Sequence, residues 1–194
     1  FPDDLTCLNI LGVITDGKGN TEEAIKIYQK ALNINENSPE THFNMGSILH
    51  RLGRSNEARV SYEKAISIKS DFLNAHFNLG LVYQNLQDNK KAIESYENAL
   101  QIKPDFHEAV GAIGTAFQAQ GELDEAIEYY KKAISINSDA RNHYNLAAGL
   151  RTQGSLDQAI EIVRRRVDEV GTNEPNILKR GNDRILVELP GLDD

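Results

Sequence analysis

Residues Asn74 to Phe106 have the sequence NAHFNLGLVYQNLQDNKKAIESYENALQIKPDF, and the pattern of this stretch recurs along the chain at an almost constant spacing. A small residue in its first half recurs every 34 residues, and once after 33, as Gly12, Gly46, Gly80, Gly114 and Ala147. Three positions in its second half keep the same step: alanine (Ala24, Ala58, Ala92, Ala126, Ala159), tyrosine (Tyr28, Tyr62, Tyr96, Tyr130) and a second alanine (Ala31, Ala65, Ala99, Ala133). In the fifth copy the last two positions hold Val163 and Arg166. Such a period predicts an array of similar structural units.

Each half of the stretch carries apolar residues at helical spacing, which predicts two amphipathic helices per copy. Glycine in the first helix and alanine in the second let the two backbones approach closely, and the tyrosine fills the space beside them. The turn between the helices holds glycine in four copies and glutamine in the third: Gly19, Gly53, Gln87, Gly121 and Gly154. Glycine there is typical of a helix C-terminus that needs a positive φ.

Over about residues 1–163 these motifs resemble tetratricopeptide (TPR) repeats, as found in bacterial scaffold proteins and in front of O-linked N-acetylglucosamine transferases. The resemblance implies an all-α fold, a right-handed superhelical solenoid of five helix pairs whose first helices line a concave groove that binds peptides or partner proteins. We assign residues 1–4 to the end of a preceding repeat and expect at least one more repeat upstream. The other repeats follow as 5–38, 39–72, 73–106, 107–139 and a partial fifth at 140–163.

Residues 164–194 leave the repeat pattern. A helix is predicted to continue to Val170 with three consecutive arginines, starting at Arg164. Ile177–Lys179 and Arg184–Leu189 are then predicted as the two strands of a β-hairpin, because apolar residues alternate in the second segment as in a half-buried strand. The predicted fold is therefore a helical solenoid with a short C-terminal helix plus a β-hairpin tail.

This C-terminal segment, from residue 159 onward, resembles part of the first extracytoplasmic domain of SecD, a subunit of the bacterial protein-export translocase. The matching residues are Arg164-Arg165-Arg166-Val167, Val170-Gly171, Glu174-Pro175, Gly181, Asp183-Arg184-Ile185 and Leu189-Pro190-Gly191. The segment is less than a fifth of the chain and lacks the transmembrane helices of SecD. No proton-driven export activity is implied. The junction is either a natural fusion or a joining of two unrelated fragments.

Composition narrows the function classes. A formal net charge of −8 argues against general affinity for nucleic acid or anionic membranes, since both need basic patches. A single cysteine, Cys7, excludes an intramolecular disulfide. The absence of an apolar run of about 18 residues predicts no membrane insertion of this chain. The repeats are expected in the cytoplasm, or in the cell envelope if the SecD-like tail is a genuine fusion.

Signals for catalysis are absent. The sequence contains no glycine-rich phosphate loop, no cysteine pair and no Ser/His/Asp set at a recognisable turn. His42, His76 and His143 share one repeat position, but stacked helices lie about 8–10 Å apart, whereas zinc ligands must converge to about 2.0–2.1 Å from one ion. We therefore predict a packing role for these histidines, no cofactor, no metal and no enzymatic activity.

One set of residues is a candidate for peptide binding. Asn44, Asn78 and Asn145 share a first-helix position that is predicted to face the groove. Stacked amides donate and accept hydrogen bonds, so they suit the backbone of an extended peptide. Ile10 and Ala112 interrupt the series, and the alternative is that each asparagine bonds its neighbouring repeat. The residues one position earlier add apolar groove surface or pack in the core: Phe43, Phe77 and Tyr144.

Three functions remain open. The leading hypothesis is a non-catalytic interaction scaffold that binds a peptide or partner protein in the groove. The first alternative is a protein-export component, with the repeats as an adaptor and an association with the export translocase through the SecD-like tail. The second is the repeat region of a larger enzyme of the glycosyltransferase type.

Overall fold

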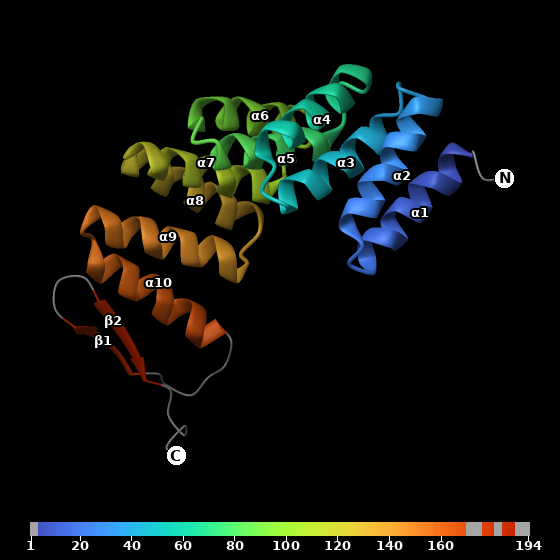
Figure 1. The fold of residues 1–194 in the computed structure, drawn as a ribbon. Coiled ribbons are helices and arrows are strands. Elements are labelled where there is room, and N and C mark those ends of the chain that lie inside the picture. Colours follow the sequence, from blue (N-terminus) through green and yellow to red (C-terminus); the bar gives the residue numbers. More distant parts are fainter. Residues whose placement is uncertain (1–3, 170–175, 181–183, 189–194) are drawn as a thin grey trace, which may run out of the picture. The chain divides into compact units, whose positions relative to one another are not determined.

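A computed structural model of the chain describes residues 4–169, 176–180 and 184–188, and its first part is a succession of helices (Figure 1). They are α1 (Leu5–Gly17), α2 (Thr21–Ile34), α3 (Pro39–Arg51), α4 (Ser55–Ile68), α5 (Leu73–Asn85), α6 (Asn89–Ile102), α7 (His107–Gln120), α8 (Leu123–Ile136), α9 (Ala140–Gln153) and α10 (Leu156–Glu169). Each odd-numbered helix packs against the even-numbered helix that follows it. The predicted array of helix pairs is confirmed. The superhelical path of the whole array and the boundaries assigned to the repeats stay predictions.

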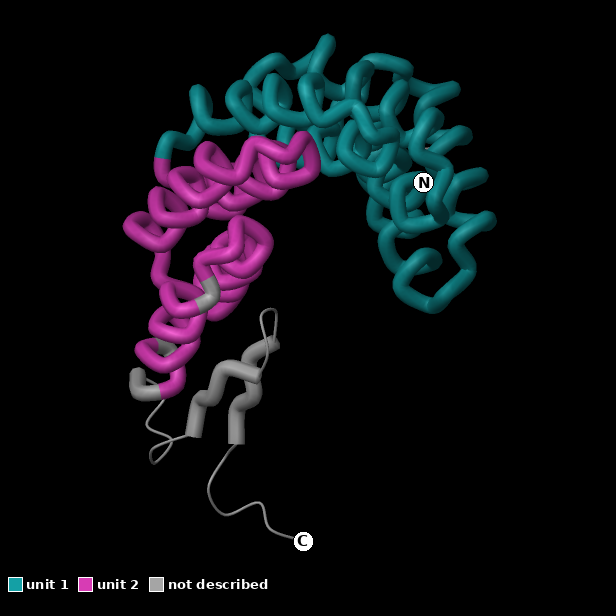
Figure 2. The backbone as a smooth tube through the Cα atoms, turned by 90° about the vertical axis from the view of Figure 1, so that its left-hand side faces the viewer, with its two compact units in different colours: residues 1–104 teal, residues 105–194 magenta. Residues whose placement is uncertain are grey.

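The chain divides into two compact units, residues 1–104 and residues 105–194 (Figure 2). The first unit contains α1 to α6, and within it α3 packs on α2 and α5 packs on α4. The second contains α7 to α10, where α9 packs on α8 in the same way. Each of α3, α5 and α9 is therefore covered by the second helix of the pair before it.

Local sequence explains where the helices begin. The side chains of Asp4, Ser38, Asp88 and Asp139 each accept a hydrogen bond from the backbone N–H three residues later, at 2.9, 3.4, 3.2 and 2.8 Å. Such caps satisfy backbone donors that have no partner inside the helix. Pro39 occupies the first turn of α3, where its missing N–H costs nothing.

The turns inside the pairs share one backbone conformation. Gly19, Gly53, Gly121 and Gly154 have φ values of 86°, 74°, 83° and 88°, as the sequence predicted. Gln87, which stands at the same place in the third pair, also has a positive φ, 61°. The turn thus keeps its left-handed geometry even where the side chain disfavours it.

The repeat period corresponds to one contact between a glycine and a tyrosine. A methyl group added to Gly12, Gly46 or Gly114 would lie 2.6, 2.9 or 2.7 Å from the ring of the tyrosine sixteen residues later, and one on Gly80 even closer to the ring of Tyr96. These tyrosines are fully buried: Tyr28, Tyr62, Tyr96 and Tyr130. Only glycine leaves room for the ring, which explains why the two residue types recur together. The fifth pair has Ala147 and Val163 instead.

Two strands follow α10. β1 (Asn176–Arg180) and β2 (Arg184–Glu188) pair antiparallel, with Leu178 opposite Leu186, and β1 lies beside α10. Leu189, the predicted end of the second strand, lies outside the described residues. The SecD-like motif residues outside the described part are Val170-Gly171, Glu174-Pro175, Gly181, Asp183 and Leu189-Pro190-Gly191. The assignment of this segment as a SecD-like hairpin stays a prediction.

Candidate peptide-binding groove

The six candidate residues lie on first helices in both units. Phe43 and Asn44 belong to α3, and Phe77 and Asn78 to α5, all in the first unit. Tyr144 and Asn145 belong to α9 in the second unit. All three asparagines are partly buried.

Asn78 is part of a polar cluster between helix pairs. Its Nδ2 donates to the Oη atom of Tyr62 at 3.4 Å, and that hydroxyl donates to Ser47 Oγ at 3.1 Å. The cluster joins α3, α4 and α5. Asn78 therefore makes the bond to a neighbouring repeat that the sequence left open as an alternative, although its length makes it a weak one.

Asn44 and Asn145 differ from Asn78, since no residue in the described part of the chain hydrogen-bonds to either amide. Asn44 lines a cleft of about 290 Å³ between α1 and α3. The other lining residues are Val13, Asp16, Tyr28, Ser47, Ile48 and Arg51. Asp16 and Arg51 form an ion pair across this cleft. Burial, reinforced by the negative charge of Asp16, raises the pKa of Tyr28 to about 12, so its hydroxyl is protonated at neutral pH.

The aromatic candidates fall into two groups. The Phe43 ring packs against the rings of Phe72 and Tyr62, with centroids 4.9 and 5.8 Å apart. The Phe77 ring lies 5.6 Å from that of Tyr96. These two rings therefore take part in the core as well as lying on first helices. Tyr144, in contrast, is 73% exposed.

The three histidines that share a repeat position use their Nε2 atoms in local hydrogen bonds. His42 bonds the carbonyl of Glu36, His76 the carbonyl of Ser70, and His143 the hydroxyl of Ser138, each at 2.9 Å. Each bond ties a first helix to the turn before it, which is a packing role. Among the residues that the structure describes, no three His, Cys, Asp or Glu side chains converge as metal ligands would.

Sequence reasoning missed the glutamines that meet the tyrosine hydroxyls. Tyr96 Oη donates to Gln84 Oε1 at 2.6 Å, and Tyr130 Oη donates to Gln118 Oε1 at 2.8 Å. Burial is the main cause that raises the pKa of both tyrosines above the usual value. The signal was present in the sequence, because the two glutamines are one repeat period apart.

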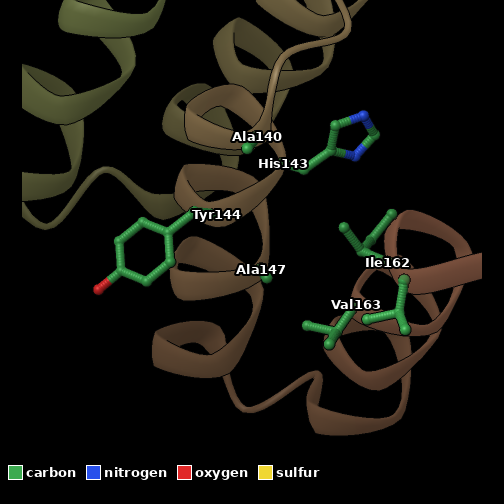
Figure 3. Close-up of a pocket in the computed structure, with 7 residues that line it drawn as sticks. Ala140, His143, Tyr144, Ala147, Ile162 and Val163 are labelled. Atoms are coloured by element: carbon green, nitrogen blue, oxygen red, sulfur yellow. The ribbon is translucent and has the colours of Figure 1, made fainter. Parts of the chain in front are cut away.

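Sequence reasoning also missed a cleft of about 180 Å³ between α9 and α10 (Figure 3). The described side chains that line it are Ala140, His143, Tyr144, Ala147, Ile162, Val163 and Val167. In Figure 3, His143 lies on the side of α9 that faces Ile162 and Val163, whereas the Tyr144 ring points away from them. Apart from His143 and Tyr144 the lining is aliphatic. This cleft is therefore suited to an apolar group.

None of the helices in the described ranges is long and apolar enough to cross a lipid bilayer.

Three family models match the chain. A model described as TPR repeat matches residues 18–53 and 46–87, and a model described as tetratricopeptide repeat matches residues 73–106 and 108–139. The model of the N-terminal part of the P1 domain of the protein translocase subunit SecDF matches residues 156–194. Helix α10 thus begins where the SecDF match begins.

Among curated proteins, SecD subunits match a short stretch of the chain. SecD of Rhodobacter capsulatus is 66% identical over 32 residues, and SecD of Rhodothermus marinus is 62% identical over 34 residues. These matches cover 16% and 18% of this chain. The chain spans only 6% of the length of either relative.

Solved structures resemble most of the chain. A crystal structure of MamA has 25% identity and a TM-score of 0.76, covering 82% of this chain and 94% of MamA. MamA from Desulfovibrio magneticus RS-1 has 20% identity and a TM-score of 0.79, covering 88% and 97%. YrrB, described as a TPR protein with an unusual peptide-binding site, has 20% identity and a TM-score of 0.70, covering 88% and 89%. Because TPR models match nearly every residue from 18 to 139 and the helix pairs follow the same period, the chain belongs to the tetratricopeptide repeat family.

Proposed function

We propose that this chain is a non-catalytic interaction scaffold that binds an extended peptide, or an extended segment of a partner protein, on the first helices of its repeats. In the first unit Asn44 and Asn78 would contact such a segment, and in the second unit Asn145 would contact one. Tyr144 would add exposed apolar surface, and Phe43 and Phe77 would hold the first helices in place. TPR proteins bind protein or peptide partners, and this chain shares their fold.

The main support for the proposal is that the side-chain amides of Asn44 and Asn145 are available to a ligand. Each lies on a first helix, is partly buried, and has no hydrogen-bond partner in the described part of the chain. An amide offers both donors and an acceptor, which match the N–H and C=O groups of a peptide backbone. Recognition of this kind would depend little on the peptide's sequence.

The test is a binding titration of a panel of short fluorescein-labelled peptides against a triple variant, Asn44→Ala/Asn78→Ala/Asn145→Ala. A hydrogen bond contributes about 0.5–1.5 kcal/mol net, so a peptide held by Asn44 and Asn78 in the first unit should bind about fivefold or more weakly, and one held by Asn145 in the second about twofold or more weakly. The loss should be similar for every peptide that binds the same unit. The triple variant should keep its helical circular dichroism, because none of the three residues lies in the fully buried core.

A matched control places the same substitution on exposed positions of second helices, as Asn33→Ala/Asn56→Ala/Asn98→Ala. This variant should bind the peptides as the parent chain does. Equal affinity of the parent and the Asn44/Asn78/Asn145 variant would overturn the proposal. Equal losses in both triple variants would also overturn it, because the effect would then not belong to the first helices.

A second candidate function rests on the SecD-like match of residues 156–194. We infer that α10 serves as the second helix of the last repeat and as the first helix of a SecD-like helix and hairpin. The repeats would then act as an adaptor for an assembly of the export translocase in the cell envelope, whereas repeats without this fusion would act in the cytoplasm. Sequencing single DNA molecules across the codons for residues 155–165 tests this candidate, and it fails if no molecule carries both halves in frame.

A further inference from the structure

The cleft between α9 and α10 lies among positions that hold a tyrosine ring in earlier pairs. In the second pair the Tyr62 ring lies against Phe43 and Gly46, and in the third pair the Tyr96 ring lies against Phe77 and Gly80. The residues that correspond in the fifth pair are Tyr144, Ala147 and Val163. All three line the cleft. Where earlier pairs enclose an aromatic ring of their own, the last pair leaves an opening.

The size and lining of this opening suit one aromatic ring. Its volume is about 180 Å³. An apolar cavity of about 150 Å³ is large enough to bind benzene. Ala140, Ala147, Ile162 and Val163 give it aliphatic walls. A ring bound there would replace the contacts that the tyrosine makes in the other pairs.

An unpaired polar atom at the cleft adds a chemical requirement. His143 is only 7% exposed and lines the cleft. Its Nε2 atom is bonded to the Ser138 hydroxyl, whereas its Nδ1 atom is buried and has no hydrogen-bond partner among the residues that the structure describes. Leaving a buried polar atom unpaired is costly. A phenol hydroxyl can donate or accept, so it would satisfy Nδ1 in either tautomer of the ring.

We propose that the cleft between α9 and α10 is a binding site for a phenol ring, supplied by a tyrosine side chain of the peptide partner. The identity of that source rests on the proposed function, but the affinity of the cleft for a phenol does not. The site is separate from the three asparagines, since none of them lines it. It would give an otherwise sequence-independent scaffold a preference for one residue type.

The first experiment titrates the intact chain with p-cresol and with toluene and follows the methyl NMR signals. Saturable shifts are expected at the methyl groups of Ala140, Ala147, Ile162, Val163 and Val167. p-Cresol should bind several-fold more tightly than toluene because only p-cresol can pair with His143 Nδ1. Absence of saturable shifts at these methyl groups, or equal affinity for the two probes, would overturn the assignment of a phenol site.

Three variants link the binding to the structure. Val163→Tyr/Ala147→Gly restores the glycine and tyrosine of the earlier pairs and should abolish p-cresol binding. His143→Val, which copies the buried Val110 of α7, should retain toluene binding and lose the preference for p-cresol. Tyr96→Val should open an equivalent space beside Phe77 and Gly80 and create a second p-cresol site. Unchanged p-cresol binding in the first variant would contradict the proposal even if all the variants fold.

The last experiment tests whether the phenol ring bound by the cleft is that of a tyrosine side chain. N-acetyl-tyrosinamide, N-acetyl-phenylalaninamide and N-acetyl-alaninamide are compared as probes of the same methyl groups. The tyrosine derivative should bind most tightly and compete with p-cresol. Binding of p-cresol without binding of the tyrosine derivative would overturn the tyrosine assignment. The Asn44/Asn78/Asn145 variant should bind p-cresol normally, so a failure of the groove proposal and a failure of this one are distinguishable.

Discussion

The third helix pair, α5 and α6, and the last pair, α9 and α10, share the same helix–turn–helix arrangement. They differ in the side chains that lie between the two helices. In the third pair Gly80 lies directly against the Tyr96 ring, which is fully buried. In the last pair Ala147 and Val163 hold these positions, and Val163 is only partly buried. The last pair retains the buried Ala159 and the nearly buried Ile160. The comparison indicates that the alanine of the second helix is enough to let the two helices pack together. The tyrosine contributes additional buried contacts.

The largest expected effect comes from removing the buried ring. Tyr96→Ala should lower the free energy of unfolding of the first unit by about 3–5 kcal/mol, because it deletes a fully buried aromatic side chain and leaves a cavity. Val163→Ala should cost only about 1 kcal/mol, since a smaller and partly exposed group is lost. Urea unfolding followed by circular dichroism measures both. Equal losses would show that the two pairs do not differ in the way described.

A middle-sized effect tests whether glycine and tyrosine depend on each other. Gly80→Ala should destabilise by about 1–3 kcal/mol, because its methyl group would overlap the Tyr96 ring. In a Tyr96→Val background, which copies the last pair, the same substitution should be neutral or stabilising, because alanine is the better helix former. The double-mutant cycle measures this coupling from four unfolding curves. Additive effects would contradict the glycine and tyrosine contact as the origin of the period.

The smallest effect concerns the turn of the third pair, which differs from all other turns in its residue type. Gln87→Gly should stabilise the chain by about 1 kcal/mol, since a left-handed backbone costs about 1–2 kcal/mol for residues other than glycine. Gly53→Gln should destabilise it by a similar amount. Thermal melts of the two variants provide the comparison. A loss of stability in Gln87→Gly would mean that the Gln87 side chain contributes more than its backbone conformation costs.

Much of the fold could be predicted because the residues that recur with the 34-residue period are the ones that the local structure requires. Three requirements each fall at one position of the repeat: a glycine beside the tyrosine ring, a small residue at the helix contact and a turn with positive φ. Gln87 shows that the turn adopts a positive φ even without glycine. The candidate site was harder to predict. Periodicity places Phe43 and Tyr144 at equivalent positions, yet one packs in the core and the other is exposed.

The features that the sequence did not predict depend on contacts between residues in different helices or repeats. The Asn78 bond to Tyr62 depends on how two pairs stack, and the cleft in the last pair depends on which neighbouring side chains are small. A pattern of residue types does not contain the directions of side chains. The roles of Asn44, Asn78 and Asn145 in binding stay predictions for the same reason.

Helix α10 connects the last repeat to β1 and could transmit motion between them. It is a continuous rod of 14 residues, about 20 Å long. Ala159 and Ile160 fasten its first half to the repeat stack, and β1 lies beside it. A rod fixed in this way behaves as a lever, since a tilt at the fastened end is carried along its length. If the last repeat moves when it binds its partner, that motion would be transmitted through α10 to β1.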